Sequence, residues 1–504
     1  MRREASRLLI TGLLGAAAST GFAPTSLPLV TLAALCGLFL AIRGQSISMT
    51  LRVAGIFAFA SWMIALRWLP AAALVVDPRA GLEGWGALVL LAAIMSIFWA
   101  VPFALARYLS NHSPVMQLVL TALLFASGEW ARANLPLGFA WNPLGSIWIE
   151  TAPIVLAATS IGATGLSALT LIAAGSLALV AERPRAGGAL LIAAGGLALA
   201  LGRGQGAEAD SDRPVVLVQG NIAQVTKWDE DQLSSQVDTY VKLTEGGSNA
   251  SKAELIFWPE AAIPFALQES PELRRKVAET LGPGDLLMTG ALGASPKGRP
   301  TNSVFLIDPQ GRIVGRYDKR ILVPFGEYIP LEPLVSVLGL SHLAPGENAL
   351  SPGSRQAAVP LNAGEAGISI CFEASFPGFG AGFAARPQYI VNPSNDAWFG
   401  IAGPPQNLAQ ARLRAIEMGL PVIRTTPTGI TAIIRADGTI AGQLPRDEPG
   451  VLSGTMPMPK PPTPFSRFGN TLPTICLLAC LAYSACRRRF SIKRSPLTFR
   501  RRRR

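Results

Sequence analysis

A series of apolar runs in the first 203 residues constrains this chain more than any other feature. Seven runs separated by short loops lie near residues 8–24, 27–42, 51–69, 86–106, 115–131, 152–181 and 187–202. A membrane-crossing helix needs about 20 predominantly apolar residues, so the first, second and seventh runs are short for a full crossing. Only 15% of the 504 residues are charged, against about 25% in an ordinary soluble domain. We therefore predict a seven-span membrane domain over residues 1–203.

The first run also has features of a secretory signal peptide. Three arginines, Arg2, Arg3 and Arg7, lie before or at the start of its apolar stretch, and small residues follow. A signal peptide is normally followed by a soluble mature domain, whereas this chain re-enters an apolar run at residue 27. We expect the first run to remain as a span, with cleavage as the alternative.

The basic residues predict the orientation of the spans. Lys and Arg are enriched in cytoplasmic loops, and a cytoplasmic N-terminus leaves only Arg79 and Arg132 in outer loops. An eighth run near residues 471–486 then returns the chain to the cytoplasm, where the tail 487–504 holds ten Lys or Arg and no acid. A basic tail after an apolar run indicates the inner side of a membrane, not a nucleic-acid site. The arginines of the inner loops are Arg43, Arg52, Arg107, Arg183 and Arg185.

Residues 204–460 have the pattern of an inserted domain. Alternating strands and helices predict α/β layers, with tight turns at the PQG and ADG sequences. The Pro-rich run 456–465 predicts an extended linker, and residues 461–504 then form the linker, the last span and the cytoplasmic tail. We predict strands within 214–221, 253–260, 285–293, 303–311, 366–373, 388–396 and 429–438, and helices near 229–246, 270–281 and 405–419.

The sequence contains few groups that could hold a metal or a cofactor. It has two histidines, His112 and His342, and no CxxC motif, which leaves little room for a zinc or haem site. It also lacks the GxSxG, Walker A and GxGxxG motifs. We expect the protein to work without a metal or a cofactor.

Cys371 is the cysteine that lies outside the predicted spans. It stands where the apolar GISI sequence gives way to a polar turn, a place where a side chain can face a cleft. A free cysteine is also commonly a small buried apolar residue, and this alternative stays open. A thiol with a pKa of about 8.5 is only slightly ionised at neutral pH, so a nucleophilic Cys371 needs a base or a cation nearby.

Two further residues at predicted strand ends can meet this need. Glu260 ends an apolar strand in WPEAAIP, and a carboxylate whose pKa is raised by burial can act as a base. Lys319 ends another strand in YDKRILVPFGEYIP, and a lysine in a cleft can stabilise a thiolate and an oxyanion. The alternatives are a surface glutamate in a turn and a solvated lysine. Three strand ends that supply Glu, Lys and Cys in this order are more specific than any one of them.

Glu260, Lys319 and Cys371 match the Glu–Lys–Cys order of the nitrilase (carbon–nitrogen hydrolase) superfamily. The sequences around them resemble its membrane branch, the apolipoprotein N-acyltransferases. This resemblance implies an α-β-β-α sandwich in the periplasm on an eight-helix base in the bacterial inner membrane, with both termini cytoplasmic. It rests on VQGNIAQVTKW (218–228), WPEAAIP (258–264), YDKRILVPFGEYIP (317–330), ICFEASFP (370–377), NPSNDAWFG (392–400), ARLRAIEMGLPVIRTT (411–426) and the EW and GFAW parts of 127–141.

The resemblance also implies roles for single residues. Cys371 would be the nucleophile, Glu260 the general base and Lys319 the oxyanion stabiliser. Supporting roles fall to two more glutamates, Glu327 and Glu373, to Phe372, and to Trp228, which would position substrate. The sequence departs from the family pattern at four places outside the Glu–Lys–Cys set: Phe372 stands where tyrosine is common, Asn407 where histidine is frequent, TTPTG (425–429) differs from the usual TNTG-like turn, and GFAW lacks a proline.

The implied reaction is acyl transfer in two half-steps, without ATP or metal. The Cys371 sulfur takes an acyl chain from a phospholipid such as phosphatidylethanolamine, and the resulting thioester passes it to the α-amine of the diacylglyceryl-cysteine of an apolipoprotein. Such covalent catalysis predicts ping-pong kinetics. We also hypothesise that the apolar stretch 333–345 is a lid or membrane-dipping arm, with a core-packing insertion as the alternative.

Two other functions stay open. An amidase acting on a small carbon–nitrogen substrate would keep the same catalytic residues, although eight spans are more than an anchor requires. A transporter or scaffold with an inactive outer domain is the other. The scarcity of charge within the spans argues against transport, because transport sites usually contain ionisable groups; Glu129 and Arg67 near span ends are the main exceptions.

Overall fold

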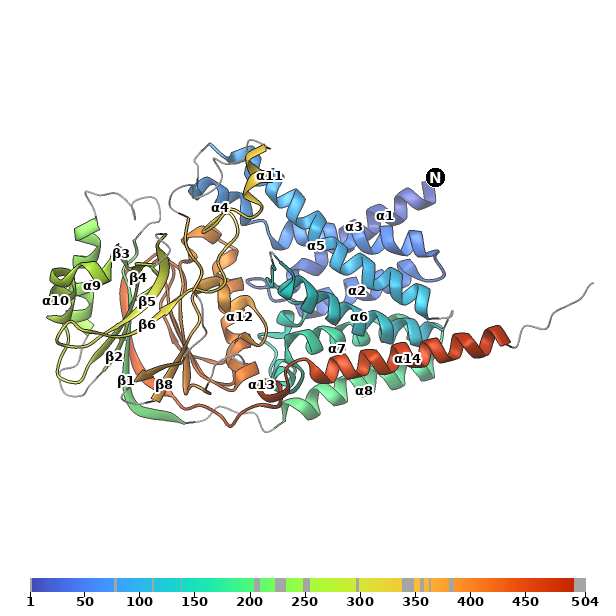
Figure 1. Cartoon of the computed structure of the whole chain (residues 1–504). Coiled ribbons are helices and arrows are strands. Elements are labelled where there is room, and N and C mark those ends of the chain that lie inside the picture. The colour runs from blue at the N-terminus through green and yellow to red at the C-terminus, as the bar shows by residue number, and fades with distance from the viewer. Residues whose placement is uncertain are drawn as a thin grey trace, which may run out of the picture.

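The computed structural model has a bundle of helices at one end and an α/β domain at the other (Figure 1). Trp228, His112, His342 and residues 338–345 of the hypothesised lid lie outside the described part of the chain. The structure describes residues 2–76, 79–110, 113–136, 138–203, 209–222, 233–247, 254–295, 299–337, 349–353, 358–361, 364–379 and 385–493.

A helix occupies each of the predicted apolar runs. Among the described residues, five helical stretches are long and apolar enough to cross a membrane: α3, α5, α6, α7 with the turn before it, and α8. Helix α2 and the first part of α14 are apolar but shorter, so a count of eight spans stays a prediction. The helices are α1 (Arg2–Ala18), α2 (Pro28–Ile42), α3 (Ile47–Ala65), α5 (Gly81–Leu109), α6 (Pro114–Asn134), α7 (Ala158–Val180), α8 (Pro184–Gly202) and α14 (Thr471–Lys493).

Several helix ends differ from the predicted ones. Helix α3 ends at Ala65, and a short helix that the pattern did not predict, α4 (Leu69–Val76), leads into α5. The run that begins at residue 152 becomes α-helical only at Ala158, after the turn η3 (Val155–Ala157). Apolar composition alone does not locate these ends, because turns buried inside the bundle are as apolar as the helices.

Helix α7 also bends at Gly162. This residue has φ of +67°, a conformation that suits glycine. A Cβ atom built there would lie 2.2 Å from Cε2 of Phe465, which packs against the bend. The bend therefore depends on the absence of a side chain.

The α/β domain contains two sheets. The first has the order β13-β1-β2-β4-β5-β6, with β3 beside β4, and the second has the order β12-β11-β10-β9-β8-β7. Helices α9 (Leu233–Gly247) and α10 (Pro271–Ala278) cover the first sheet, and α12 (Gly403–Met418) lies between the second sheet and the helical bundle (Figure 1). The predicted α-β-β-α sandwich is confirmed.

A strand lies within each of the seven predicted strand regions. The PQG and ADG turns join the antiparallel pairs β5–β6 and β11–β12, as expected. The strand bounds are β1 (Asp210–Gln219), β2 (Leu255–Phe257), β3 (Ile263–Ala266), β4 (Leu286–Gly293), β5 (Thr301–Ile307), β6 (Ile313–Asp318), β7 (Ala358–Leu361), β8 (Gly364–Ile368), β9 (Tyr389–Pro393), β10 (Val422–Thr425), β11 (Ala432–Ile434), β12 (Ile440–Gln443) and β13 (Gly450–Pro457).

The prediction of an extended linker over residues 456–465 is wrong at both ends. Met456 and Pro457 belong to β13, which pairs with β1, and the last residues begin α13 (Pro464–Phe468). Between them, the Lys460 N–H donates to the carbonyl oxygen of Gly419. The Pro-rich segment is therefore packed against the domain, because its first residues are paired in the sheet.

Helix α12 joins the α/β domain to the bundle. The side-chain oxygen of Gln406 accepts hydrogen bonds from the indole N–H groups of Trp68 (3.2 Å) and Trp141 (2.7 Å), and its amide donates to the Ala65 carbonyl (3.1 Å). One cluster of buried apolar side chains continues from the membrane helices into the space between the two sheets. The domain and the bundle are therefore packed as one unit.

Candidate active site

Three sheet strands place Glu260, Lys319 and Cys371 together. Glu260 lies three residues after β2, Lys319 directly follows β6, and Cys371 begins the turn η8 (Cys371–Ser375) after β8. Their exposed fractions are 5%, 1% and 3%. Glu260 and Lys319 are thus neither a surface turn residue nor a solvated lysine.

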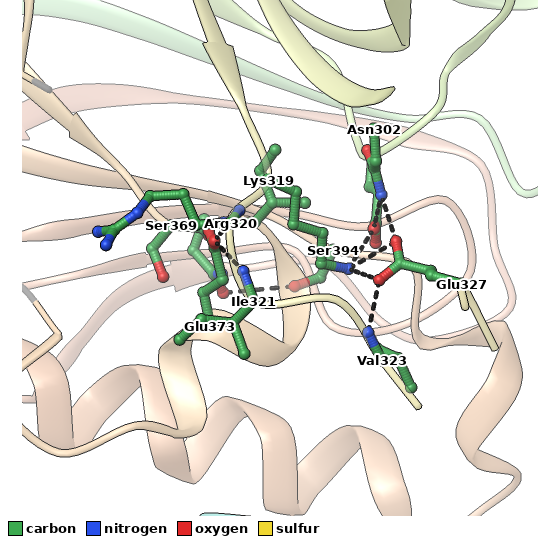
Figure 2. A network of polar contacts seen from close by, with 12 residues as sticks. Asn302, Lys319, Arg320, Ile321, Val323, Glu327, Ser369, Glu373 and Ser394 are labelled. Atoms are coloured by element: carbon green, nitrogen blue, oxygen red, sulfur yellow. Dashed lines mark hydrogen bonds and ion pairs between the residues drawn. The ribbon is translucent and has the colours of Figure 1, made fainter. Parts of the chain in front are cut away.

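Lys319 lies between two carboxylates. Its Nζ is 3.2 Å from Oε1 of Glu260 and 2.9 Å from Oε1 of Glu327, which Figure 2 shows beside it. Burial alone would lower the pKa of Lys319, but the charges of Glu260, Glu327 and Cys371 raise it above its ordinary value. The ammonium group therefore stays charged, as an oxyanion stabiliser must.

Asn302, to which the sequence pattern did not point, binds both glutamates. The Asn302 side-chain amide donates to Oε1 of Glu260 (2.7 Å) and to Oε1 of Glu327 (2.8 Å), as Figure 2 shows for Glu327. The other oxygen of Glu327 accepts from the N–H of Val323 (2.8 Å). Asn302 and Lys319 thus hold the two carboxylates from opposite strands of one hairpin. Nothing in the sequence around Asn302 marks it out as a functional residue.

The turn that carries Glu260 is held close to β4. The N–H of Gly290 donates to the carbonyl oxygen of Pro259 (3.1 Å). A Cβ at Gly290 would lie 2.4 Å from the backbone nitrogen of Ala261, whose φ is +48°. Only glycine allows this approach, which fixes the position of Glu260 beside Lys319.

Cys371 is held in an unusual backbone conformation. Its φ of +50° is in the left-handed region, which costs energy for a residue other than glycine. Burial raises the pKa of the thiol, as does the negative charge of Glu260, whereas Lys319 and the backbone of Asn395 oppose the rise. The resting group is therefore a thiol, and it needs a base before it can attack.

Glu373 connects the turn of Cys371 to the loop of Lys319. Its carboxylate accepts from the backbone N–H groups of Ile370 (2.7 Å), Arg320 (2.7 Å) and Ile321 (3.1 Å), and from the Tyr317 hydroxyl (3.1 Å). Burial raises the pKa of Glu373 to about 7, against the lowering effect of these backbone bonds. Figure 2 shows it on the opposite side of Lys319 from Glu327. These contacts make Glu373 a positioning residue.

Phe372 packs against two aromatic rings, one of which, Phe139, lies on the bundle side of the junction. Its ring centroid is 6.0 Å from that of Phe139 and 5.1 Å from that of Phe376, and Phe139 in turn lies beside Trp141 (6.4 Å). A tyrosine at position 372 would need a partner for its hydroxyl, whereas phenylalanine packs without one. The GFAW segment noted in the sequence thus lies close to the turn that carries Cys371.

Asn407 belongs to a buried polar network in the α/β domain. Its amide donates to Oδ1 of Asp396 (2.9 Å), whose two oxygens also accept from Arg424 (both 2.7 Å). The charge of Asp396 also raises the pKa of Cys371, by less than burial and the charge of Glu260 do. Asn407 therefore holds a carboxylate that influences the Cys371 thiol.

The chain matches two protein families over different parts of its length. Residues 215–460 match the carbon–nitrogen hydrolase family, and residues 14–176 match the N-terminal domain of apolipoprotein N-acyltransferases. Among solved structures, an amidase from Nesterenkonia sp. is 16% identical and covers 50% of this chain and 92% of its own, with a TM-score of 0.36.

Two curated relatives match both parts of the chain. The apolipoprotein N-acyltransferase of Bradyrhizobium diazoefficiens is 36% identical over 432 residues, which are 81% of this chain and 79% of that protein. The one from Caulobacter vibrioides is also 36% identical, over 82% of this chain and 81% of its own. At these identities and lengths, the chain belongs to the apolipoprotein N-acyltransferase family.

Proposed function

We propose that this protein transfers an acyl chain from a phospholipid, through a thioester on Cys371, to the α-amine of the N-terminal diacylglyceryl-cysteine of apolipoproteins. The observation that carries the proposal is the buried cluster in which Lys319 contacts Glu260 and Glu327 and influences the Cys371 thiol. Family membership supports the choice of acyl transfer. The packing of this cluster's domain against apolar helices supports a lipid as the donor.

In the first half-reaction, Glu260 accepts the proton of Cys371 and the sulfur attacks the ester carbonyl carbon of the phospholipid. Lys319 stabilises the resulting oxyanion. The bond between this carbon and the ester oxygen then breaks, and the lysophospholipid leaves with the proton that Glu260 returns. The acyl chain remains on the sulfur as a thioester.

In the second half-reaction, the acceptor amine attacks the thioester carbon. An α-amine has a pKa of about 8, so a useful neutral fraction exists near neutral pH. Glu260 takes a proton from the attacking nitrogen and returns it to the departing Cys371 sulfur, and an amide is formed. Lys319 again stabilises the oxyanion. The residues needed for both steps are thus the same three, and Asn302, Glu327, Glu373 and Phe372 hold them in place.

The arrangement in the membrane follows from the same proposal. Residues 1–203 form the membrane domain, 204–460 the catalytic domain in the periplasm, and 461–504 the linker, the last span and the cytoplasmic tail. The arginines of the inner loops and of the tail support this orientation in the bacterial inner membrane. A donor such as phosphatidylethanolamine is available in that membrane.

Intact-mass analysis of the protein purified from membranes tests the chemistry. We expect an acyl adduct that hydroxylamine removes, present in the parent protein and absent from Cys371→Ala. Cys476→Ala is the matched control, because Cys476 is an exposed cysteine on α14 and should leave the adduct unchanged. An adduct that persists in Cys371→Ala would overturn the proposal. Release of ammonia from small amides, without any adduct, would favour an amidase.

A further inference from the structure

A cavity of about 620 Å³ lies between the helical bundle and the catalytic domain. The end of α6 and the turn after it form one wall, with Leu135 and Gly138. The loop after Lys319 contributes Ile321 and Leu322 to the opposite wall. Ligand pockets typically have volumes of about 300–1,000 Å³ and largely apolar walls, so this cavity has the size and lining of a binding site.

Two arginine side chains give the largely apolar lining of the cavity a positive charge. Arg299 and Arg320 both line it, and its described lining contains no Asp or Glu. Arg299 is exposed and Arg320 is half-buried, so both can meet a ligand. Guanidinium groups bind phosphate oxygens with paired hydrogen bonds. The lining therefore suits a molecule that has both an apolar part and an anionic group.

The cavity also lies next to the candidate catalytic residues. Arg320 directly follows Lys319, and its backbone N–H is held by Glu373 at 2.7 Å. The ring of Phe376, which lines the cavity, packs 5.1 Å from that of Phe372, the neighbour of Cys371. A ligand that contacts Phe376 in the cavity is thus separated from Phe372, in the turn that carries the thiol, by the Phe376 side chain alone.

The bundle side of the cavity gives a lipid a way to approach. Leu135 lines the cavity, is 52% exposed and directly follows α6, which is long and apolar enough to cross a membrane. An apolar side chain at the end of such a helix lies at the level where lipid headgroups meet the bilayer core. This position favours a phospholipid over the peptide of an acceptor protein as the occupant.

We infer that this cavity holds the phosphate-bearing part of the phospholipid donor, with Arg299 and Arg320 paired to its phosphodiester. The inference rests on the proposed function and adds the groups that recognise the donor. A negative charge between two arginines would orient the donor so that its acyl ester faces Cys371. The two arginines therefore act on binding of the donor and not on the reacting carbonyl.

Donor kinetics of the full-length protein in detergent micelles test this inference. Thioester formation on Cys371 is measured against the concentration of phosphatidylethanolamine and of a diacylglycerol with the same chains, which lacks the phosphate. We expect Arg299→Gln combined with Arg320→Gln to raise the KM for phosphatidylethanolamine about tenfold. Thioester formation from diacylglycerol should not change.

Two control variants separate charge from packing. Arg320→Lys keeps the positive charge and should retain part of the preference for the phospholipid. Arg275→Gln removes an exposed arginine from α10, on the far side of the catalytic domain from the bundle (Figure 1), and should have no effect.

Each other outcome has a distinct meaning. An equal loss with both donors, no loss with either, or a loss confined to the step with the acceptor would overturn the inference, and the last would assign the cavity to the acceptor. If the parent protein forms no thioester from either donor, the proposed function itself fails.

Discussion

At the scale of single residues, Lys319 carries a positive charge between the buried carboxylate of Glu260 and the partly buried carboxylate of Glu327. Moving a proton from Cys371 to Glu260 leaves the total charge of this cluster unchanged. Creating an additional charge in a buried site costs free energy. A proton transfer within the cluster forms the thiolate without this cost. The raised pKa of Lys319 keeps the positive charge in place throughout.

Asn302 should affect the rate more than substrate binding. Asn302→Ala removes the hydrogen bonds that hold Glu260 and Glu327 from the side of β5, so that Lys319 has to hold both carboxylates. Hydrogen bonds to charged groups contribute about 1.5–3 kcal/mol, so we expect kcat to fall between about tenfold and a hundredfold with little change in KM. The exposed Gln310→Ala in the β5–β6 turn is the control. An unchanged kcat would show that Asn302 does not position the glutamates.

Glu373 should make stability depend on pH. Its pKa is raised from 4.5 to about 7 in the folded protein, so the folded state binds the extra proton. The stabilisation is present below pH 4.5 and is lost as the pH rises through about 7. We expect the Tm advantage of the parent over Glu373→Gln to be larger near pH 5 than near pH 8. An advantage that grows with pH would contradict this.

At the scale of elements, the strands determine which residues meet. The predicted strand ends located Glu260, Lys319 and Cys371, because polar residues after apolar runs are visible in the sequence. Asn302 could not be found in this way, because its role depends on the register of β5 with β6, in which Ser303 faces Asp318. That register brings the Asn302 carbonyl oxygen to the N–H of Lys319 (2.8 Å). Pairing between strands is not visible in local composition.

The bend in α7 should tolerate no side chain. Gly162→Ala forces a Cβ against Phe465 and a positive φ on alanine, and we expect a loss of about 1–3 kcal/mol in stability. Gly195→Ala in α8 is the matched control, because nothing lies within 4 Å of its added Cβ. It should leave Tm unchanged or raise it. Thermal unfolding in detergent measures both. Equal effects at the two positions would exclude the contact with Phe465 as the reason for the glycine.

At the scale of the whole molecule, the sequence predicted where the long helices lie but did not establish how many of them span the membrane. Apolar runs marked each long helix of the bundle but not the short α4, and five helical stretches reach the length and hydropathy of a span among the described residues. Helix ends such as Ala65 depend on packing within the bundle, and the short α4 is as apolar as its neighbours. Composition therefore located the membrane domain without fixing its topology.

Reporter fusions test the proposed orientation. With both termini in the cytoplasm, a fluorescent protein fused after residue 504 should fluoresce, and alkaline phosphatase fused there should be inactive. Alkaline phosphatase fused after residue 203 should be active, because seven spans place that point in the periplasm. An active C-terminal phosphatase would exclude α14 (Thr471–Lys493) as a returning span.

The shared apolar core also decides whether the catalytic half can exist by itself. Phe399 packs against Trp68 and Trp141, and Phe372 packs against Phe139, so the face of the catalytic domain that meets the bundle carries aromatic side chains. A fragment of residues 204–460 without the bundle would expose this apolar face to water and self-associate. A soluble catalytic fragment would therefore require polar substitutions on that face.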